Sequence, residues 1–473
     1  MGRINTNVSS LIAQTSLARN NANLNTSLQR LSTGLKINTG ADDPAGLIAS
    51  EALKAEQTGI SQAISNANSA NNIIGTAEGG LTEVSNLLNQ LDGLVNQSAN
   101  SGALSKDQVA ANQLQVDSIL STVNRIAGTT SFQGTKLLNG NFAYTTSSVA
   151  ASAFATLNVN AANLPANTTK AVVVSVTNSA TLGQVAHASV TSALGGAAIT
   201  LEVAGNAGTQ QLSFAGSSTY TQIATAINNI SSTTGVTASA SGANITFKAS
   251  NYGSSQYVSV AAISGTFSIT GGTSGKAAGK DAVVAVNGAA AQADGTKITY
   301  RDNNLDVNFT LSAALNNGKQ KTFGITGGGA TFALGSTVTE TDKASIGIQS
   351  VSSGSLGDST LGYLSSLQSG GANSLSSASL VNAQKIISES ITQVSSLRGR
   401  LGAFQKYTIG STINSLGVAY ENASAAESNI ADTNFASETA NLTRAQILSQ
   451  AATTVLASAN NAPQSALTLL QGH

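Results

Sequence analysis

Cysteine is absent from this chain of 473 residues, and charged side chains make up only 9% of it. Without cysteine, neither a disulfide framework nor a thiolate metal site can form. The formal net charge is zero, whereas a polynucleotide or an anionic membrane favours a basic protein. We therefore expect no nucleic-acid partner, and solubility must come from Ser, Thr, Asn and Gln.

Long hydrophobic runs are also missing. No stretch has the length that a membrane-spanning helix needs, and the N-terminal MGRINTNVSSLIAQTS contains no apolar segment of signal-peptide length. We predict no membrane span. If the protein leaves the cell, we expect an export route that does not use a cleaved signal.

Histidine is too scarce for most catalytic or metal sites, since it occurs only at His187 and His473. A His-pair zinc site is thereby excluded. A Ser–His–Asp triad would need His187, which has no G-x-S-x-G motif beside it, and we predict a surface histidine there. Asp302 and Asp306 bracket a predicted turn, but nothing supports a glycosidase pair. We predict a protein that is not an enzyme and uses no cofactor or metal.

Aromatic residues are absent before Phe132, and this marks a difference between the ends and the middle of the chain. Residues 1 to about 140 and about 375 to 473 are rich in Ala, Asn, Gln, Ser and Leu, with apolar residues at heptad spacing. The middle is rich in Gly, Thr and Val, which alternate with a period of two. We predict an α+β multidomain fold. Its N- and C-terminal segments together form a long α-helical coiled coil or bundle, and the middle is a β-rich insertion.

The first predicted helix carries a leucine stripe, and the next begins at a clear cap. Asp43 is a good N-cap, and Pro44 at the first helical position loses no hydrogen bond. That second helix runs to about Gln97 unless Gly79-Gly80 interrupts it. The stripe of the first helix consists of Leu17, Leu24, Leu28, Leu31 and Leu35.

Three further helices are predicted. One has its seam from Val109 to Ile126, and another has its seam from Leu380 to Phe404. The last spans roughly 439–459, and we expect Pro463 to stop it. Residues 1–41 carry only basic charges, while 421–473 are mainly acidic. This asymmetry favours pairing of the two ends.

The predicted domain order follows from these elements. Residues 1–42 with 430–473 form a terminal helical coiled-coil domain, and 43–143 with 346–429 form a helical bundle. Residues 144–345 form the insert, as one module or as two that divide near 271–280. An isolated pair of terminal helices rich in small residues buries too little to offset its ordering entropy. We therefore expect neighbouring copies to order the terminal domain.

Several motifs at the two ends resemble those of bacterial flagellins. RLSTGLKINTGADDPAGLIASEALKAE (30–56) is similar to the family's N-terminal fingerprint. SLRGRLGAFQKY (396–407), AESNIADTNFASETANLTRAQILSQ (426–450) and NNAPQSALTLL (460–470) resemble its C-terminal pattern. The middle is only loosely similar, although 190–270 resembles a small module often inserted in flagellins and hook-associated proteins.

The resemblance implies a structural subunit that self-polymerises into the extracellular flagellar filament for swimming motility. It implies export through the flagellar type III apparatus with an export chaperone, and contact with the cap and hook-associated proteins. The terminal helices would line the filament's inner core and the variable insert would point outward. The implied subunit-interface residues are Leu17, Leu24, Leu28, Leu31, Leu35, Phe435, Leu442, Ile447, Leu448, Val455, Leu467 and Leu470.

Two alternatives stay open at this point. A hook–filament junction protein shares the terminal design, although the full match at both ends and the large insert favour the filament subunit. The insert could instead be an adhesin or a carbohydrate-binding module. The only sequence feature that would indicate such a binding insert is a surface cluster of Tyr252, Tyr257 and Tyr300. Packing of these tyrosines in the core explains their presence better.

The family also carries a segment that a flagellin-sensing Toll-like receptor reads, and here it corresponds to LLNQLDGLVNQSAN (87–100). Leu94 matches the apolar contact of that segment. Gln90 stands where strongly recognised members have arginine, and Gln115 where they have glutamate. Because both changes remove charge-assisted hydrogen bonds, the resemblance implies weak receptor activation.

Overall fold

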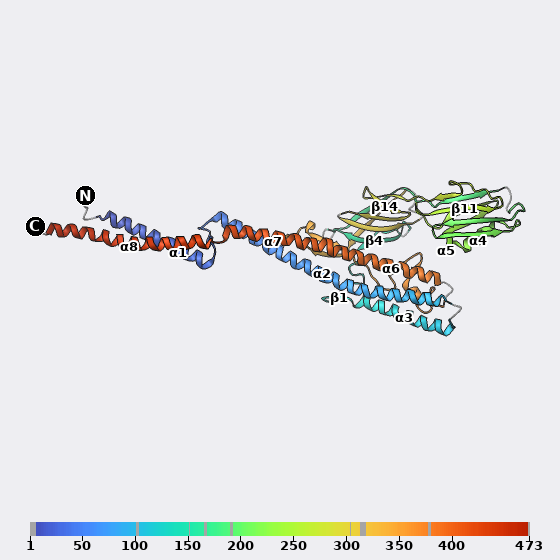
Figure 1. Ribbon diagram of the computed structural model, residues 1–473, viewed down its shortest axis with the longest axis horizontal. Coiled ribbons are helices and arrows are strands. Elements are labelled where there is room, and N and C mark those ends of the chain that lie inside the picture. The colour runs from blue at the N-terminus through green and yellow to red at the C-terminus, as the bar shows by residue number, and fades with distance from the viewer. Residues whose placement is uncertain are drawn as a thin grey trace. The chain divides into compact units, whose positions relative to one another are not determined.

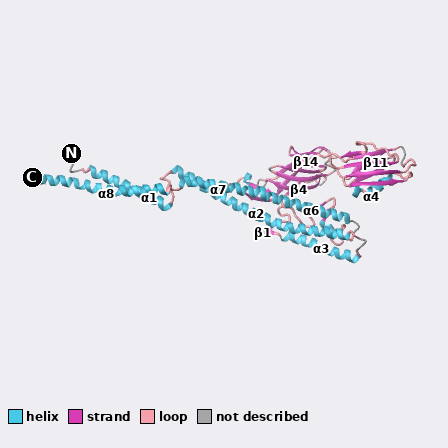
Figure 2. Cartoon of the chain, viewed as in Figure 1, coloured by secondary structure: helices cyan, strands magenta, loops and turns pink. Residues whose placement is uncertain are grey.

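A computed structural model describes residues 6–100, 104–150, 152–164, 168–189, 193–302, 304–312, 318–376 and 380–471, without the side chains of 465–471. Long helices come from both ends of the sequence and most strands from the middle, which confirms the predicted fold class (Figure 2). The chain forms two compact units. The terminal unit comprises Met1–Ala67, Leu334–Val338 and Gly410–His473, and the central unit comprises Asn68–Ala333 and Thr339–Ile409.

The terminal unit is built on two antiparallel helices, α1 (Val8–Thr33) and α8 (Phe435–Gln471), which lie side by side (Figure 1). Gly34 ends α1 in the left-handed conformation, with φ at 74°, as a glycine C-cap does. Beyond it the backbone of Lys36 donates to the carbonyl of Ala431 at 2.7 Å, at the end of α7 (Gly410–Ala431). The two ends of the sequence therefore pair, as their charges indicated.

The expectation that Pro463 stops the last helix is wrong, because α8 continues through it to Gln471. A proline inside a helix has no N–H for the carbonyl four residues before it, here that of Ala459. In this fold the Asn7 side chain donates to that carbonyl, with 2.6 Å between Nδ2 and O. The helix continues because another segment of the chain satisfies the group that the proline leaves unpaired.

The helix α2 (Pro44–Ser98) is continuous through Gly79 and Gly80, so the interruption that this glycine pair could cause does not occur. Apolar residues on both sides of the pair, Ile74, Ala77, Leu81, Val84, Leu88, Leu91 and Val95, are buried in the central unit and hold the segment in a helix. α3 (Lys106–Thr129) starts at a capping box formed by Ser105 and Gln108. α6 (Leu380–Ala403) continues directly into a π-helical turn, η3 (Phe404–Ile409).

Short elements connect the helices to the insert. They are β1 (Ser131–Phe132), β2 (Thr135–Lys136), β18 (Ala330–Ala333), η1 (Glu340–Asp342), β19 (Lys343–Ile346), β20 (Gly357–Asp358), β21 (Gly362–Tyr363) and η2 (Leu364–Leu367). They form hairpins and single turns, with β1 paired to β2, β18 to β19 and β20 to β21.

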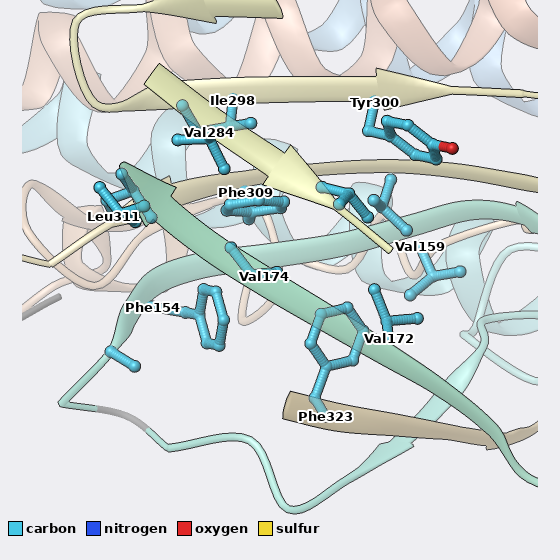
Figure 3. Packing of buried hydrophobic residues seen from close by; sticks show 14 of the residues in the cluster. Phe154, Val159, Val172, Val174, Val284, Ile298, Tyr300, Phe309, Leu311 and Phe323 are labelled. Atoms are coloured by element: carbon cyan, nitrogen blue, oxygen red, sulfur yellow. The ribbon is translucent and has the colours of Figure 1, made fainter. Parts of the chain in front are cut away.

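The first module of the insert is one antiparallel sheet of eight strands in the order β3-β17-β5-β13-β14-β15-β16-β4. Its core contains Phe154 of β4 and Phe323 of β17, whose ring centroids are 5.7 Å apart although these strands lie near opposite ends of that order (Figure 3). The sheet is therefore rolled around its own apolar face. The strands are β3 (Thr145–Ser147), β4 (Phe154–Ala162), β5 (Lys170–Asn178), β13 (Val283–Val286), β14 (Ala289–Asp294), β15 (Lys297–Arg301), β16 (Leu305–Leu311) and β17 (Gln320–Gly327).

The second module has two sheets and two helices around a separate core. β7 and β8 form a hairpin, and α4 buries Ile223 and Ile227. The elements are β6 (Gln184–Ala188), β7 (Ile199–Gly205), β8 (Gly208–Phe214), α4 (Tyr220–Asn229), α5 (Ser231–Thr234), β9 (Val236–Ser241), β10 (Asn244–Ala249), β11 (Tyr257–Ser264) and β12 (Lys276–Ala278).

The second module is nested inside the first in sequence. Residues Thr181 and Lys280 exchange backbone hydrogen bonds of 2.9 and 3.1 Å where the chain leaves and re-enters the first module. The second of these two boundaries lies at the end of the range 271–280, and the strands on both sides of the nested module belong to one sheet. The first boundary, near Thr181, had no glycine-rich signal of its own.

His187 corrects another expectation, because it is a core residue with only 9% of its surface exposed. Its ring stacks on Phe267, with 4.0 Å between centroids, and its Nδ1 lies 2.6 Å from the carbonyl of Ser268. Since a carbonyl only accepts, Nδ1 carries the proton and Nε2 accepts from the Tyr220 hydroxyl at 3.1 Å. A polar residue that has both nitrogens satisfied can lie in a core without a catalytic role.

The three tyrosines that could have marked a binding surface do not share one environment. Tyr300 is buried in the first core, and Tyr257 lies under the ammonium of Lys276 in the second module. Tyr252 is exposed. Within the described residues, no helix combines the length and the apolar character that crossing a membrane requires.

Candidate assembly interface

The most buried positions in the contact between α1 and α8 are small or polar residues at heptad spacing. On α1 the buried positions are Ser10, Ala13 and Ser27. On α8 buried and half-buried residues alternate at steps of four and three, the spacing of a coiled-coil seam. The buried members are Glu438, Ala445, Ala452 and Ala459, and the half-buried ones are Leu442, Ser449, Leu456 and Pro463.

Side-chain hydrogen bonds fix the register of this pair at intervals along its length. Asn7 caps α1 by accepting from the backbone N–H of Ser10 at 3.0 Å, while its amide donates to Ala459. The Ser10 hydroxyl donates to Asn460 at 2.7 Å. Farther along, Asn20 donates to the Leu448 carbonyl at 3.2 Å. Polar groups at seam positions specify one register, because any shift leaves them unpaired.

The same seam contains a buried carboxylate near the start of α8. Glu438 accepts from the Ser27 hydroxyl at 2.5 Å and lies 3.8 Å from the guanidinium of Arg30. Breaking such a buried pair by removing one partner costs several kcal/mol, more than the pair itself contributes. A register that moved Glu438 away from Ser27 and Arg30 would therefore be disfavoured.

Large apolar side chains of the same two helices remain exposed in the single chain. They lie away from the seam, so the contact between the two helices does not bury them. On α8 they follow a second stripe, in which Leu448 and Val455 are 46% and 57% exposed. The full set on both helices is Val8, Leu11, Ile12, Leu28, Phe435, Ile447, Leu448 and Val455.

The predicted interface residues divide into three groups. Leu28, Phe435, Ile447, Leu448 and Val455 are exposed. Leu17, Leu24, Leu31, Leu35 and Leu442 are half-buried. Leu467 and Leu470 lie outside the residues whose side chains are described.

Three of the five leucines in the predicted stripe also lie at the intramolecular seam. Leu17, Leu24 and Leu31 share the heptad position of Ser10, which contacts α8. Sequence reasoning did not single out Asn7, Ser10 and Glu438. The one available signal was Pro463, which lies in the heptad pattern and implies a carbonyl that needs a donor.

The cap at the start of α2 has the geometry that its sequence indicates. The Asp43 carboxylate accepts from the backbone N–H of Gly46 at 3.0 Å, and Pro44 is the first helical residue. In the preceding turn Asp42 accepts from the backbone N–H groups of Thr39 and Asn38, and these hydrogen bonds lower the pKa of Asp42.

The segment compared with the receptor-binding site lies on α2 in the central unit. Gln90 is exposed, Leu94 is half-buried, and Gln115 is exposed on α3. The two helices are neighbours, since Asn112 of α3 donates to the Ser98 hydroxyl at 3.1 Å. All three residues are accessible in the single chain.

Comparisons with known proteins agree with the helical ends. The family model for the bacterial flagellin N-terminal helical region matches residues 4–143, and the model for the C-terminal helical region matches 384–470. Among solved structures, the flagellar cap protein D2-D3 domains from Serratia marcescens are 18% identical over 35% of this chain and 97% of that chain, with a TM-score of 0.26. A score this low does not establish a shared fold.

Curated relatives extend the match over the whole length. The B-type flagellin of Pseudomonas aeruginosa is 30% identical over 99% of both chains. Flagellin C of Vibrio cholerae is 31% identical, again over 99% of both chains. The chain therefore belongs to the flagellin family, whose members are the structural subunits of the extracellular bacterial flagellar filament.

Proposed function

We propose that this chain polymerises into a flagellar filament through the exposed apolar faces of α1 and α8. The observation that carries the proposal is the set of large apolar side chains that the contact between α1 and α8 leaves exposed to solvent. Each leucine that becomes fully buried contributes roughly 1.5–3 kcal/mol. Heterologous contacts that do not close into a ring generate an open helical assembly.

The same reasoning supports different roles in the filament for the three predicted parts of the chain. We assign 1–42 with 430–473 to the filament's inner core, 43–143 with 346–429 to a supporting bundle, and 144–345 to an outward insert. The predicted interface set, Leu467 and Leu470 included, belongs to the first of these parts. This is a structural role, and we propose no catalytic activity.

Substitution of the second stripe on α8 tests the interface. Leu448→Ser and Val455→Ser should each raise the concentration of unpolymerised subunit at equilibrium by about tenfold, since about 1.4 kcal/mol corresponds to that factor. Seeded polymerisation followed by sedimentation and electron microscopy measures this concentration. Ile263→Ser is the matched control, because Ile263 is also half exposed, at 53%, but lies in the insert.

Truncation gives a second, coarser test. Chains that lack residues 1–40 or 430–473 should stay soluble and folded in the central unit but form no filaments. Filaments from either truncated chain would refute the assignment of the ends, as would an unchanged equilibrium concentration for the two serine variants.

Export and partners follow from family membership and are proposed on that basis. We propose secretion through the flagellar type III apparatus without a cleaved signal, with a chaperone before export and the cap and hook-associated proteins at the filament's ends. Deleting the export apparatus should leave the subunit inside the cell, which immunoblotting of culture supernatants measures.

We also propose weak activation of the flagellin-sensing Toll-like receptor. Gln90 and Gln115 are exposed but carry no charge, so neither can form the charge-assisted hydrogen bonds that the strongly recognised members make there. Gln90→Arg combined with Gln115→Glu should raise the potency of the monomer in a reporter-cell assay. Potency of the unchanged chain equal to that of a strongly recognised flagellin would refute this proposal.

A further inference from the structure

A cavity of about 490 Å³ in the central unit has an unusual charge composition. Its wall is formed by strands β4 and β19, the β15–β16 hairpin, and the segment in which α6 continues into η3. The charged side chains that line it are Arg301, Asp306 and Arg400. Two guanidinium groups and one carboxylate thus line the cavity, which carries one positive charge in excess.

The single carboxylate is already engaged by groups other than Arg400. Asp306 lies 2.7 Å from Arg301 Nε and accepts from the Asn160 amide at 2.9 Å. The side-chain oxygen of the same amide, Asn160 Oδ1, accepts from the guanidinium of Arg400. Asn160 is only 6% exposed, so its amide is a fixed part of the wall. Among the described residues, Arg400 therefore interacts with Asp306 through an intervening amide, without a direct ion pair.

Burial makes this arrangement unfavourable for the guanidinium as it stands. It lowers the pKa of Arg400, the nearby Asp306 opposes that shift, and Arg301 adds to it. A charge that is partly removed from water without a direct counterion is destabilising. A guanidinium also presents several N–H donors in a plane that matches the oxygens of a carboxylate or sulfate.

The helical wall of the cavity is itself irregular. η3 is a π-helical turn of 6 residues, and it places Phe404, Tyr407 and Thr408 at the cavity. π-helical turns are rare and are often found at functional sites, because they change the direction of side chains within a helix. Tyr407 is 69% exposed although it is aromatic.

We propose that this cavity binds a small oxyanion, a carboxylate or a sulfate, with Arg400 as its principal ligand. The anion supplies the counter-charge that Asp306 does not provide directly, and Tyr407 and Thr408 bring hydroxyl groups to the same space. The source is either a free small acid or a carboxylate of a neighbouring copy, because both offer the same chemistry.

Saturation-transfer NMR on the full-length monomer with glucuronate as the probe tests the proposal. We expect a signal that sulfate suppresses by competition and that chloride at equal ionic strength does not suppress. Arg400→Gln should weaken glucuronate binding by about tenfold or more, since one hydrogen bond to a charged group contributes that factor. Arg125→Gln, which removes an exposed arginine of α3, is the control for net charge and should bind normally.

A second variant guards against a folding defect in Arg400→Gln. Arg301 is 67% exposed at the edge of the cavity, so Arg301→Gln should fold and weaken binding less than Arg400→Gln does. The absence of any signal with the unchanged chain would overturn the proposal, and so would equal binding by the unchanged chain and by Arg400→Gln.

The assembled state distinguishes the two sources of the anion. The measurement is repeated with sonicated filaments by equilibrium dialysis of labelled glucuronate. Retained binding supports a free small acid as the natural ligand. Binding that polymerisation abolishes supports a neighbouring carboxylate in the same site.

Discussion

At the scale of single residues, Asn7 and Pro463 form one functional pair. Pro463 deprives the Ala459 carbonyl of its helical donor, and the Asn7 amide replaces that donor at 2.6 Å. The same Asn7 side chain caps α1 through the backbone of Ser10. One side chain thus joins the beginning of one terminal helix to the interior of the other.

A double-mutant cycle measures this coupling. Asn7→Ala removes a cap and leaves a carbonyl without a donor, which should cost about 2 kcal/mol. In a Pro463→Ala background the residue at 463 regains its N–H and can donate to Ala459 itself. The cost of Asn7→Ala should then fall by about 1 kcal/mol.

Hydrogen exchange of the peptides around Ala459, measured by mass spectrometry on the full chain, reports the opening free energy of this segment. Equal costs in both backgrounds would show that Asn7 acts only as a cap. Asn21→Ala is a suitable comparison, because Asn21 also pairs with α8, through the Ser449 hydroxyl at 2.8 Å, but lies far from Pro463.

Asp281 makes the connection between the two insert modules dependent on pH. Its carboxylate accepts from Ser254 of the second module, through both hydroxyl and backbone, and from the Gly295 N–H of the first at 2.7 Å. The Ser254 hydroxyl contributes most to lowering the pKa of Asp281, followed by the two backbone donors. A lowered pKa in the folded state means stability that is present above the unfolded pKa and is lost as pH falls through the folded value.

Asp281→Asn should therefore lower the urea midpoint of the insert at neutral pH. The amide nitrogen that takes the place of Oδ2 cannot accept from the Ser254 hydroxyl, and the remaining hydrogen bonds lose the carboxylate charge. The difference from the unchanged chain should shrink below about pH 4, as the native carboxylate becomes protonated. Tyrosine fluorescence is a usable signal, since the chain has no tryptophan. Asp294→Asn, at an exposed carboxylate of β14, should show no such convergence; a difference for Asp281→Asn that persists unchanged at low pH would contradict the assignment.

At the scale of elements, the continuity of α2 through two glycines shows what packing adds to propensity. A Cβ at Gly79 would meet nothing within 4 Å, whereas one at Gly80 would lie 2.8 Å from Leu138 Cδ1 and from Thr130 Oγ1. Gly80 is thus required by the close approach of the segment after α3. Gly79 has no such neighbour and only weakens the helix.

The two glycines should respond to alanine in opposite ways. Gly79→Ala should stabilise the central unit by about 1 kcal/mol, the usual difference between the two residues in a helix interior. Gly80→Ala should destabilise it, because its methyl group would displace Leu138 and Thr130. Urea unfolding of the full chain measures both, and destabilisation by Gly79→Ala would contradict the account.

Most helices could be predicted from the sequence, because a heptad pattern and local caps such as Asp43-Pro44 are encoded within one segment. Predictions failed where a distant segment decides. From the sequence, Pro463 predicts a helix end, because nothing local shows that Asn7 lies beside Ala459. In the same way, the sequence around His187 predicts exposure, because Phe267 and Tyr220, which contact it, are distant in sequence. The cavity near Arg400 could not be predicted either, since its wall combines four segments that are separated in sequence.

At the scale of the whole molecule, the insert has a hierarchy that the sequence showed only in part. The glycine-rich stretch 271–279 lies at one end of the second module. The other end, near Thr181, follows β5, and the amino-acid composition does not change there. The first module is completed by β13 to β17, which return after the second module has ended. Its core therefore depends on segments on both sides of the nested module and not on that module itself.

This hierarchy predicts that the second module can be removed. Thr181 and Lys280 are hydrogen-bonded to each other, so replacing residues 182–279 by a short Gly-Ser linker closes a small gap without disturbing the first core. The shortened chain should fold, keep its tyrosine-monitored transition for the first module, and polymerise with an unchanged equilibrium concentration of free subunit.

Removal of residues 172–286 is the matching control, because it deletes β5 and β13 from the middle of the eight-stranded sheet. That chain should lose the first module and expose its apolar residues, with aggregation as the visible result. Circular dichroism, limited proteolysis and electron microscopy of both chains decide the matter. Aggregation of the 182–279 replacement would show that the two modules fold as one unit, whereas filaments from both deletions would show that assembly at the helical ends needs no intact insert.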